Sequence, residues 1–498
     1  MEQELSPAMP AQEREEQPAR VIKKEYLEVP RHGVLSAGLL LQVIENRWRQ
    51  RPVSPEIPAS LGALCQLAVD EKLTHLWVLD EVEADTAYYE ATSEEWNLRA
   101  NWKYTAGRML PPGRMNLLSS VSGFRRVPKG GQLHITIIFP KHAHVPWRWV
   151  KRAAARDALL TILYLERALE IPITGSAPTA GVRLLEKMQR TGHHPEWLEI
   201  PDLDWDHLPF RLRDVAADLI AERPLLPEER TASYLHKIDK NGAYLRACVT
   251  EMLGVGTPEL VNTCQSQEKR PGIWRCSFDP IELPGLPAVW DGGAWLVTPI
   301  LQSLRSTGHD VVVHEGYVWN ESHGVFKRWA ETLWNVRQGF RLGSYKDQTW
   351  KSEQVRALAE DACKQIATAT IGLTSYRGFE TKTFKFRPDW KAQIVGGVRA
   401  RMFSNLLKLQ QEQDITPIIT YIDGMYLLSS EPDIYKVAGS LLDKPNALGG
   451  FKPEWSLAVT DEVRLAFNSN LSIVEKLEVF NRMINEGKGT KYGSGKEL

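Results

Sequence analysis

The sequence has few of the features that mark secreted, metal-stapled or membrane-spanning proteins. Its 498 residues include 5 cysteines, and no two of them have the Cys-x-x-Cys spacing of a metal or redox site. A small, scattered set of cysteines is typical of a reducing compartment. No apolar run reaches the length of a membrane span, and the first residues have no apolar signal-peptide core. We therefore expect a cytoplasmic protein that does not contact a membrane.

An excess of charge of either sign is also missing. The net charge is −1, and charged and hydrophobic residues make up 25% and 43% of the chain, which is ordinary for a globular protein. A nucleic-acid-binding surface would therefore have to arise from local clusters of basic residues. The length allows roughly two to four domains. The sequence contains neither an internal repeat nor a low-complexity tract.

The order of apolar patterns predicts a multidomain α/β and α+β protein. Residues 1–25 are polar and charged, which is typical of a disordered tail. Strand-like runs at 74–80 and 132–139, with a helical pattern at 147–169, predict an α/β domain that we place at 26–200. Prolines and acidic residues then indicate a connecting segment at 201–230.

Two carboxylates follow short apolar strands in the second half of the chain. Residues 420–426 read as a strand, a tight Asp-Gly turn and a second strand, which places Asp423 at the tip of a hairpin. Asp239 leaves an earlier strand and precedes an Asn-Gly turn and the aromatic Tyr244. Each of these segments alone is explained equally well as an ordinary turn.

Helical patterns at 326–341, 351–370 and 390–411 lie between the two carboxylates in the sequence, and the second of them is notable. Spacings of four and eight residues put Arg356 and Glu360 on the same face as Lys364. Two cations on one helix face suit the phosphates of a nucleoside triphosphate. A solvated ion ladder along an exposed helix explains the same spacing without any ligand.

In this order, the three segments resemble the palm motifs of family B DNA polymerases, most closely those of the protein-primed subgroup. Residues 239–245 are similar to the family's Asp-x-Asn-Ser-Leu-Tyr-Pro motif. Residues 364–372 are similar to its Lys-x-x-x-Asn-Ser-x-Tyr-Gly motif, with Thr, Ala and Ile in place of Asn, Ser and Tyr. Residues 421–423 match the start of Tyr-x-Asp-Thr-Asp-Ser.

Two connecting segments extend the resemblance to about residues 231–470. Residues 309–319 look like the family's palm strand that leads into the fingers, and residues 448–454 are similar to its Leu-Gly-x-x-x-x-Glu run. The resemblance implies an RNase H-like, exonuclease-like domain at 26–200 and a palm with fingers at 231–455. The fingers would span about 326–372, and a short thumb and tail would occupy 456–498.

The resemblance also implies roles for particular side chains. Asp239 and Asp423 would be the catalytic metal ligands and would hold Mg²⁺ or Mn²⁺ in an active polymerase. Tyr244 would stack under the nucleotide sugar, and Lys364 with Arg356 would bind the triphosphate.

Basic side chains around the fingers and beyond them are expected to contact phosphates of DNA. These are Lys327, Arg337, Arg341 and Arg399. The implied partners are single-stranded or primer-template DNA, a deoxynucleoside triphosphate, and a terminal or accessory protein.

One departure from the family's third motif bears directly on activity. Met425 stands where the family has its second metal-bridging aspartate. A thioether is soft and uncharged and does not replace a carboxylate on Mg²⁺, so this residue argues against template-directed nucleotidyl transfer. The alternative is that Gly424 adopts a positive φ and re-aims Asp423 into the second ligand position.

These observations predict a family B DNA polymerase-like protein that binds DNA and nucleotide in the replication or maintenance of a mobile or phage-like element. The alternative is an inactive relative that serves as a DNA-binding structural or regulatory factor. A third interpretation is a nuclease-like domain fused to an inert palm. Asp80, Glu81 and Glu83 lack the Asp-x-Glu spacing of an exonuclease, so we expect the N-terminal domain to be inactive.

Overall fold

The computed structural model describes most of the chain in fourteen stretches. These are residues 31–44, 47–54, 61–79, 103–106, 120–126, 132–140, 147–173, 175–190, 201–215, 219–262, 268–281, 293–343, 352–377 and 385–492. The tail predicted at 1–25 and the acidic residues at 80–83 lie outside these stretches. No helix of the described part is long and apolar enough to cross a membrane.

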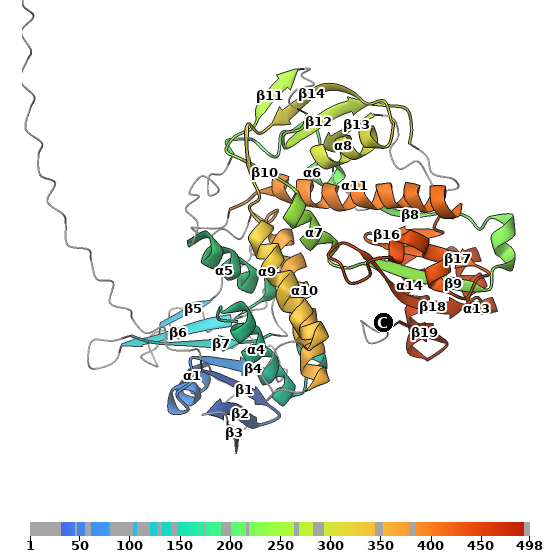
Figure 1. Cartoon of the computed structure of the whole chain (residues 1–498). Coiled ribbons are helices and arrows are strands. Elements are labelled where there is room, and N and C mark those ends of the chain that lie inside the picture. Colours follow the sequence, from blue (N-terminus) through green and yellow to red (C-terminus); the bar gives the residue numbers. More distant parts are fainter. Residues whose placement is uncertain are drawn as a thin grey trace, which may run out of the picture.

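The N-terminal part contains a seven-stranded sheet with helices on both faces (Figure 1). Its strand order is β3 (Arg47–Pro52), β2 (Leu39–Ile44), β1 (His32–Ser36), β4 (His75–Val78), β7 (Gln132–Ile138), β6 (Ser120–Arg126) and β5 (Lys103–Ala106). The pairs β1–β4 and β4–β7 are parallel and the others antiparallel.

Alternating apolar side chains let this sheet bury both of its faces. Val34, Trp77 and Ile138 face helices α4 (Ala155–Leu169) and α5 (Ala177–Arg190), while Leu35 and Leu76 face α1 (Leu61–Asp70). The helix predicted at 147–169 is interrupted. It begins as the short 3₁₀ helix η2 (Arg148–Arg152), and extended backbone at residues 153 and 154 separates this from α4.

A second sheet has the strand order β11 (Glu259–Asn262), β14 (Val312–Val318), β12 (Gly272–Ser277) and β13 (Gly293–Val297), and helix α8 (Thr298–Ser306) packs on it. Beside it, β10 (Leu253–Val255) pairs with β15 (Glu321–His323). The strand predicted at 309–319 exists as β14, but its assignment to the sheet of the palm motifs is wrong. Its hydrogen-bonded neighbours are β11 and β12, whereas Asp239 lies in a different sheet.

Helices α9 (Lys327–Leu342) and α10 (Glu353–Leu373) confirm the helical stretches predicted within 326–372, and both pack against α4 and α5 in one apolar core (Figure 1). Glycine at 181 lets α10 approach closely, because a Cβ there would lie 1.8 Å from Thr370 Oγ1. The indole Nε1 of Trp329 donates to the Gly181 carbonyl over 2.9 Å. The N-terminal part and these two helices therefore share a single core.

The C-terminal sheet is antiparallel throughout. Its order is β19 (Gly489–Lys491), β18 (Phe451–Ala458), β9 (Tyr234–Lys240), β17 (Gly424–Ser429), β16 (Ile419–Tyr421) and β8 (Ile220–Glu222). Because β8 forms an edge strand, the segment at 201–230 is more than the connection we predicted. It also includes α6 (Leu212–Val215) and η4 (Pro227–Thr231).

Helices cover both faces of the C-terminal sheet. One face packs against α11 (Pro388–Gln413), α12 (Ile434–Ala438) and η6 (Gly439–Leu442). The other packs, over part of its length, against α13 (Asp461–Asn468) and α14 (Ile473–Asn485), and α14 starts with a capping box between Ser472 and Glu475. Helix α7 (Ala243–Thr250) follows β9 directly.

Candidate functional site on the C-terminal sheet

Asp239 lies near the end of β9, on the face of the sheet that α13 and α14 cover only in part. It lies in the part that these helices leave uncovered. Side chains alternate along a strand, so Leu235, Lys237 and Asp239 share one face, and the buried Ile238 belongs to the opposite one. On the neighbouring strand, Gly424 is the residue directly opposite Asp239. A Cβ built on Gly424 would lie 3.5 Å from Asp239 Oδ1. Residue 424 therefore faces the carboxylate.

Met425 points to the other side of the sheet. Its register partner on β9 is Ile238, and its fully buried side chain belongs to the same apolar core as Ile238 and Leu427. The thioether thus fills a core that a carboxylate would disrupt. Alternation along β17 means that a longer side chain at 425 would still point away from Asp239.

The hairpin tip differs by one residue from the predicted Asp-Gly turn. Tyr421 pairs with Gly424, so the two turn residues are Ile422 and Asp423. Ile422 has a φ of 61°, whereas Gly424 is not among the residues with positive φ. The prediction that Gly424 re-aims Asp423 through a positive φ is therefore wrong. A β-branched residue in the left-handed region is strained, and the Lys240 amide holds the turn by donating to the Asp423 carbonyl over 3.0 Å.

The structure brings the two predicted metal ligands into electrostatic contact. Both side chains are half-buried. Burial, followed by the charge of Asp239, raises the pKa of Asp423 to about 7. Burial also raises the pKa of Asp239, and the nearby Lys452 ammonium opposes this increase more than any other group.

Two lysines and a glutamate complete this face. Lys452 on β18 lies directly opposite Asp239 on β9, with its Nζ 3.7 Å from Asp239 Oδ2, and it also donates to Glu454. Lys237 Nζ lies 3.6 Å from Glu454 Oε2. Glu454 is the extra residue of a bulge between Pro453 and Trp455, and its carboxylate lies beside the Lys452 ammonium. We call Asp239, Lys237, Lys452 and Glu454 the palm-face cluster.

The side chains present fit a two-metal site poorly. The described residues include no group of three or more histidine, cysteine, aspartate or glutamate side chains placed to hold a metal ion. Mg²⁺ requires oxygen ligands in a nearly octahedral arrangement, and two adjacent ions need bridging carboxylates. Here Gly424 offers no ligand toward Asp239, and the Lys452 ammonium already contacts that carboxylate.

The turn after Asp239 positions the predicted nucleotide-binding tyrosine. Gly242, with a φ of 71°, begins α7, and Asn241 Nδ2 donates to the Pro445 carbonyl over 3.3 Å. Tyr244 then lies in the first turn of α7, half-buried between the two largest apolar cores. Its contact with a nucleotide sugar stays a prediction.

The structure separates the two cations predicted to bind triphosphate. Lys364 Nζ lies 3.7 Å from Glu360 Oε1 and 3.7 Å from Asp361 Oδ1. Its charge also acts on Asp239 and Glu454. Arg356 lies beside Tyr164, about 12 Å further along α10, and next to the end of α9. Only Lys364 is therefore placed toward the cluster.

The four predicted DNA contacts have different surroundings. Lys327 is exposed at the start of α9, and Arg399 is half-buried in α11. Arg337 is 4% exposed, with Nε 3.2 Å from Glu360 Oε1, so its prediction as a phosphate contact is wrong. Arg341 is half-buried with Nε and Nη1 lacking hydrogen-bond partners among the described residues, and its charge interacts with Glu454.

Sequence reasoning missed Lys237, Lys452 and Glu454 as site residues. Lys237 could have been found from alternation, because it lies two residues before Asp239 on the same strand. The pairing of β18 with β9 joins residues more than 200 positions apart. No local pattern predicts that pairing.

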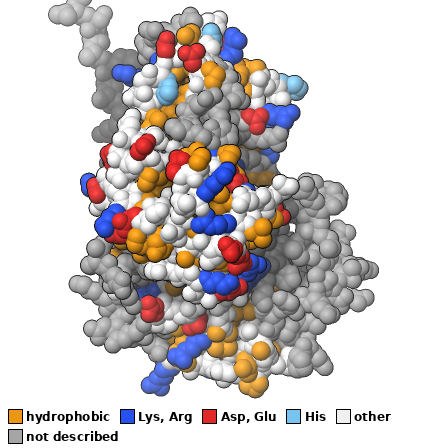
Figure 2. Space-filling model, turned by 90° about the vertical axis from the view of Figure 1, so that its right-hand side faces the viewer, with side chains coloured by type: hydrophobic (Ala, Val, Ile, Leu, Met, Phe, Trp, Pro, Cys, Tyr) orange, Lys and Arg blue, Asp and Glu red, His pale blue; other side chains and the backbone are white. Residues whose placement is uncertain are grey.

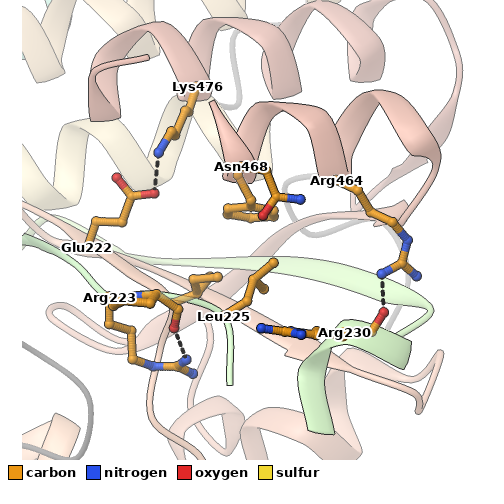
Figure 3. Close-up of a pocket in the computed structure, with 10 residues that line it drawn as sticks. Glu222, Arg223, Leu225, Arg230, Arg464, Asn468 and Lys476 are labelled. Atoms are coloured by element: carbon orange, nitrogen blue, oxygen red, sulfur yellow. Dashed lines mark hydrogen bonds and ion pairs between the residues drawn. The ribbon is translucent and has the colours of Figure 1, made fainter. Parts of the chain in front are cut away.

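A separate cleft of about 800 Å³ lies where residues 222–230 meet α13 and α14 (Figure 3). Lys476 Nζ lies 2.6 Å from Glu222 Oε1, and the Arg223 guanidinium lies 2.5 Å from Glu229 Oε1. Arg464 donates to the Arg230 carbonyl. The lining of this cleft shares no residue with the palm-face cluster, and most of the charged side chains in the lining already have partners.

The side of the molecule that carries α13 mixes charges of both signs. Figure 2 shows acidic and basic side chains interspersed over the described part of this surface, without a large patch of one sign. A continuous basic stripe, the usual signature of a nucleic-acid surface, is therefore not seen on this side among the described residues.

The sequence matches no protein-family profile and no curated protein sequence. Among solved structures, the chain is similar to the Phi29 DNA polymerase complexed with primer-template DNA, with a TM-score of 0.49 and 13% identity, over 86% of this chain and 85% of that one. It is also similar to the family B DNA polymerase of the hyperthermophilic archaeon Pyrobaculum calidifontis. There the TM-score is 0.37 and the identity 11%, over 92% of this chain and 65% of that one.

Proposed function

We propose that this chain is a family B DNA polymerase-like protein that binds DNA and a deoxynucleoside triphosphate without catalysing metal-dependent nucleotidyl transfer. The observation that carries the proposal is the surroundings of Asp239. The residue facing it on β17 is Gly424, Met425 is buried on the reverse face, and Lys452 Nζ lies 3.7 Å from the carboxylate. Action in the replication or maintenance of a mobile or phage-like element stays a prediction, as does a terminal or accessory partner protein.

The reaction that this arrangement disfavours is well defined. Phosphoryl transfer by two metal ions needs carboxylates that bridge both ions, so that one ion activates the attacking hydroxyl and the other stabilises the leaving group. Asp239 and Asp423 are the residues that would hold such ions. The Lys452 ammonium lies beside Asp239, and no carboxylate faces Asp239 from β17. The positive charge of metal ions, which would stabilise the transition state, is therefore poorly held here.

Nucleotide binding has separate support. The charges of Lys364 on α10 and Arg341 on α9 both act on Glu454 of the palm-face cluster, although each also interacts with Glu360. Two buried nitrogens of Arg341 lack hydrogen-bond partners among the described residues, so their donors are unsatisfied. Tyr244, in the first turn of α7 five residues after Asp239, is the residue that we propose for contact with the sugar. A triphosphate would therefore lie between α9, α10 and the C-terminal sheet.

The test combines DNA binding with primer extension. Fluorescence anisotropy of a labelled primer-template in EDTA is expected to show binding that weakens as the salt concentration rises. Extension with all four nucleotides and either Mg²⁺ or Mn²⁺ is expected to be undetectable. Extension that Asp239→Ala abolishes would overturn the proposal.

A matched pair of lysine variants tests the nucleotide site. Lys364 and Lys408 are both 45% exposed on helices, and each forms an ion pair with a glutamate four residues away. Lys364→Ala is expected to weaken binding of a fluorescent nucleoside triphosphate by about tenfold, since a charge-assisted hydrogen bond contributes about 1.5–3 kcal/mol. Lys408→Ala should leave it unchanged, and equal effects of the two variants would contradict the assignment.

The alternative function is an active polymerase with altered metal binding. The electrostatic coupling of Asp239 with Asp423 is the observation in its favour. The nuclease interpretation rests on residues 80–83, which lie outside the described stretches. Degradation of a labelled single strand would test it.

A further inference from the structure

Lys452 occupies an unusual place for a lysine. It lies across the strand pair from Asp239, and its Nζ contacts both the Asp239 and Glu454 carboxylates. The side chain is only 18% exposed, and those of Asp239 and Glu454 are 25% and 28% exposed. A surface ion pair between freely moving side chains would be far more exposed than this.

The palm-face cluster is balanced in charge without any bound ion. Asp239 and Glu454 contribute two negative charges, and Lys452 and Lys237 contribute two positive ones. A divalent cation brought to Asp239 would meet two ammonium groups already in contact with this cluster. Their repulsion is strong because the groups are partly shielded from water. The cluster is therefore built to repel the ion that its carboxylates would otherwise attract.

The bulge in β18 brings Trp455 onto the same face as Lys452 and Asp239. Without the bulge, Lys452 and Glu454 would still share one face of the sheet, but Trp455 would point to the opposite face and lose its packing against α14. With it, Lys452, Glu454 and Trp455 all lie on the Asp239 face. The lysine is thus positioned by the ladder of the sheet and by two carboxylates.

We propose that Lys452 is a resident counter-cation, whose ammonium group takes the place of a divalent metal ion between Asp239 and Glu454. The inference rests on the proposed function, since both concern the Asp239 carboxylate, and it names what keeps the site metal-free. Removal of this one positive charge would leave two partly buried carboxylates on either side of the space that the Lys452 ammonium now fills. Two carboxylates with several waters are a usual coordination set for Mg²⁺ or Mn²⁺.

The experiment measures Mn²⁺ binding to the full chain without DNA or nucleotide. Titrations followed by electron paramagnetic resonance count the ions lost from the free Mn²⁺ signal. The arms are the wild type, Lys452→Met and the double variant Lys452→Met with Asp239→Asn; methionine keeps most of the length of the lysine stem. Lys436→Met, which removes an exposed lysine from the Glu431 ion pair, is the matched control.

We expect Lys452→Met to gain one Mn²⁺ site at least tenfold tighter than any in the wild type. The double variant should lose it, and Lys436→Met should behave as the wild type. A stoichiometric Mn²⁺ site in the wild type that Asp239→Asn removes would overturn the inference. A folded Lys452→Met variant that gains no site would overturn it as well.

A second measurement covers the case in which Lys452→Met does not fold. The melting temperature of the wild type, taken with EDTA and with 10 mM Mn²⁺, should not rise with the metal, because an ion that binds only the native state would stabilise it. A rise that Asp239→Asn abolishes would overturn the inference. Failure here leaves the DNA and nucleotide binding measured in EDTA unaffected, so the two proposals fail separately.

Discussion

At the scale of single residues, strand alternation decides which side chains form the site. Asp239 was predicted as a carboxylate leaving a strand, and the structure places it there. The resemblance to the family's third motif drew attention to Met425, yet the residue that faces Asp239 is Gly424. Pairing register fixes this, and register depends on a partner strand that local sequence does not identify.

Substitutions at Met425 test its place in the core. Met425→Asp is expected to destabilise the protein by at least about 3 kcal/mol, because it buries a charge without a partner. Met425→Leu is the control and should cost less than about 1.5 kcal/mol, since it conserves volume and polarity. Urea unfolding followed by tryptophan fluorescence measures both. Similar stability of the two variants would show that residue 425 faces water.

The buried His236 makes stability depend on pH. Its Nε2 donates to the Glu431 carbonyl over 2.9 Å, so the neutral ring accepts from the Ser456 hydroxyl at Nδ1. Burial lowers the pKa of His236 below its ordinary value of 6.5. The unfolded chain therefore binds a proton that the folded chain excludes, and the free energy of unfolding should fall as the pH drops below about 6.5.

The measurement for His236 is urea unfolding between pH 5 and pH 7.5. His236→Gln removes the titrating ring and keeps a side chain that can donate and accept hydrogen bonds. We expect its unfolding free energy to decline less steeply toward pH 5 than that of the wild type. Equal slopes would mean that the histidine does not contribute.

At the scale of elements, long helices could be predicted and sheet membership could not. The pattern at 390–411 gives α11 and that at 326–372 gives α9 and α10, because a helix is specified by its own apolar face. The palm strand predicted at 309–319 exists as a strand at 312–318, but it lies in a different sheet from Asp239. Any apolar strand can join several sheets, and only tertiary pairing selects one.

The contact between α5 and α10 gives a prediction with an internal control. Gly181→Ala would place a Cβ 1.8 Å from Thr370 Oγ1, so the helices must separate, at a cost of about 1–3 kcal/mol. Gly372→Ala lies on α10 with nothing within 4 Å of the new Cβ. It should stabilise the helix by about 0.5–1 kcal/mol. Thermal unfolding of the two variants should shift in opposite directions, and a shared direction would contradict the close approach.

At the scale of the whole molecule, the mixed α/β, multidomain organisation was predictable, and the grouping of its cores was not. The sequence divides the N-terminal part from the helices predicted as fingers. In the folded chain, α9 and α10 share one core with α4 and α5. Another core joins the second sheet to α11 and to the buried face of the C-terminal sheet. Neighbours in sequence therefore belong to different packing units.

Hydrogen exchange followed by mass spectrometry tests this grouping. Leu165→Ala truncates a fully buried side chain of α4 and should cost about 2–5 kcal/mol. We expect faster exchange in α10 as well as in α4, with β9 and β18 unchanged. Phe480→Ala in α14 is the matched control, which should speed exchange in the C-terminal sheet and spare α10. Faster exchange confined to α4 after Leu165→Ala would contradict a shared core.

The glycine opposite Asp239 has a consequence for how this chain can change over generations. A single base change converts any glycine codon into one for aspartate or glutamate. Such a codon at 424 would add an acidic side chain 3.5 Å from the Asp239 carboxylate at its first atom, without disturbing the apolar core behind the sheet. The present state of the site is thus one inheritable step from a paired-carboxylate face, and selection against that step would show that its absence is useful.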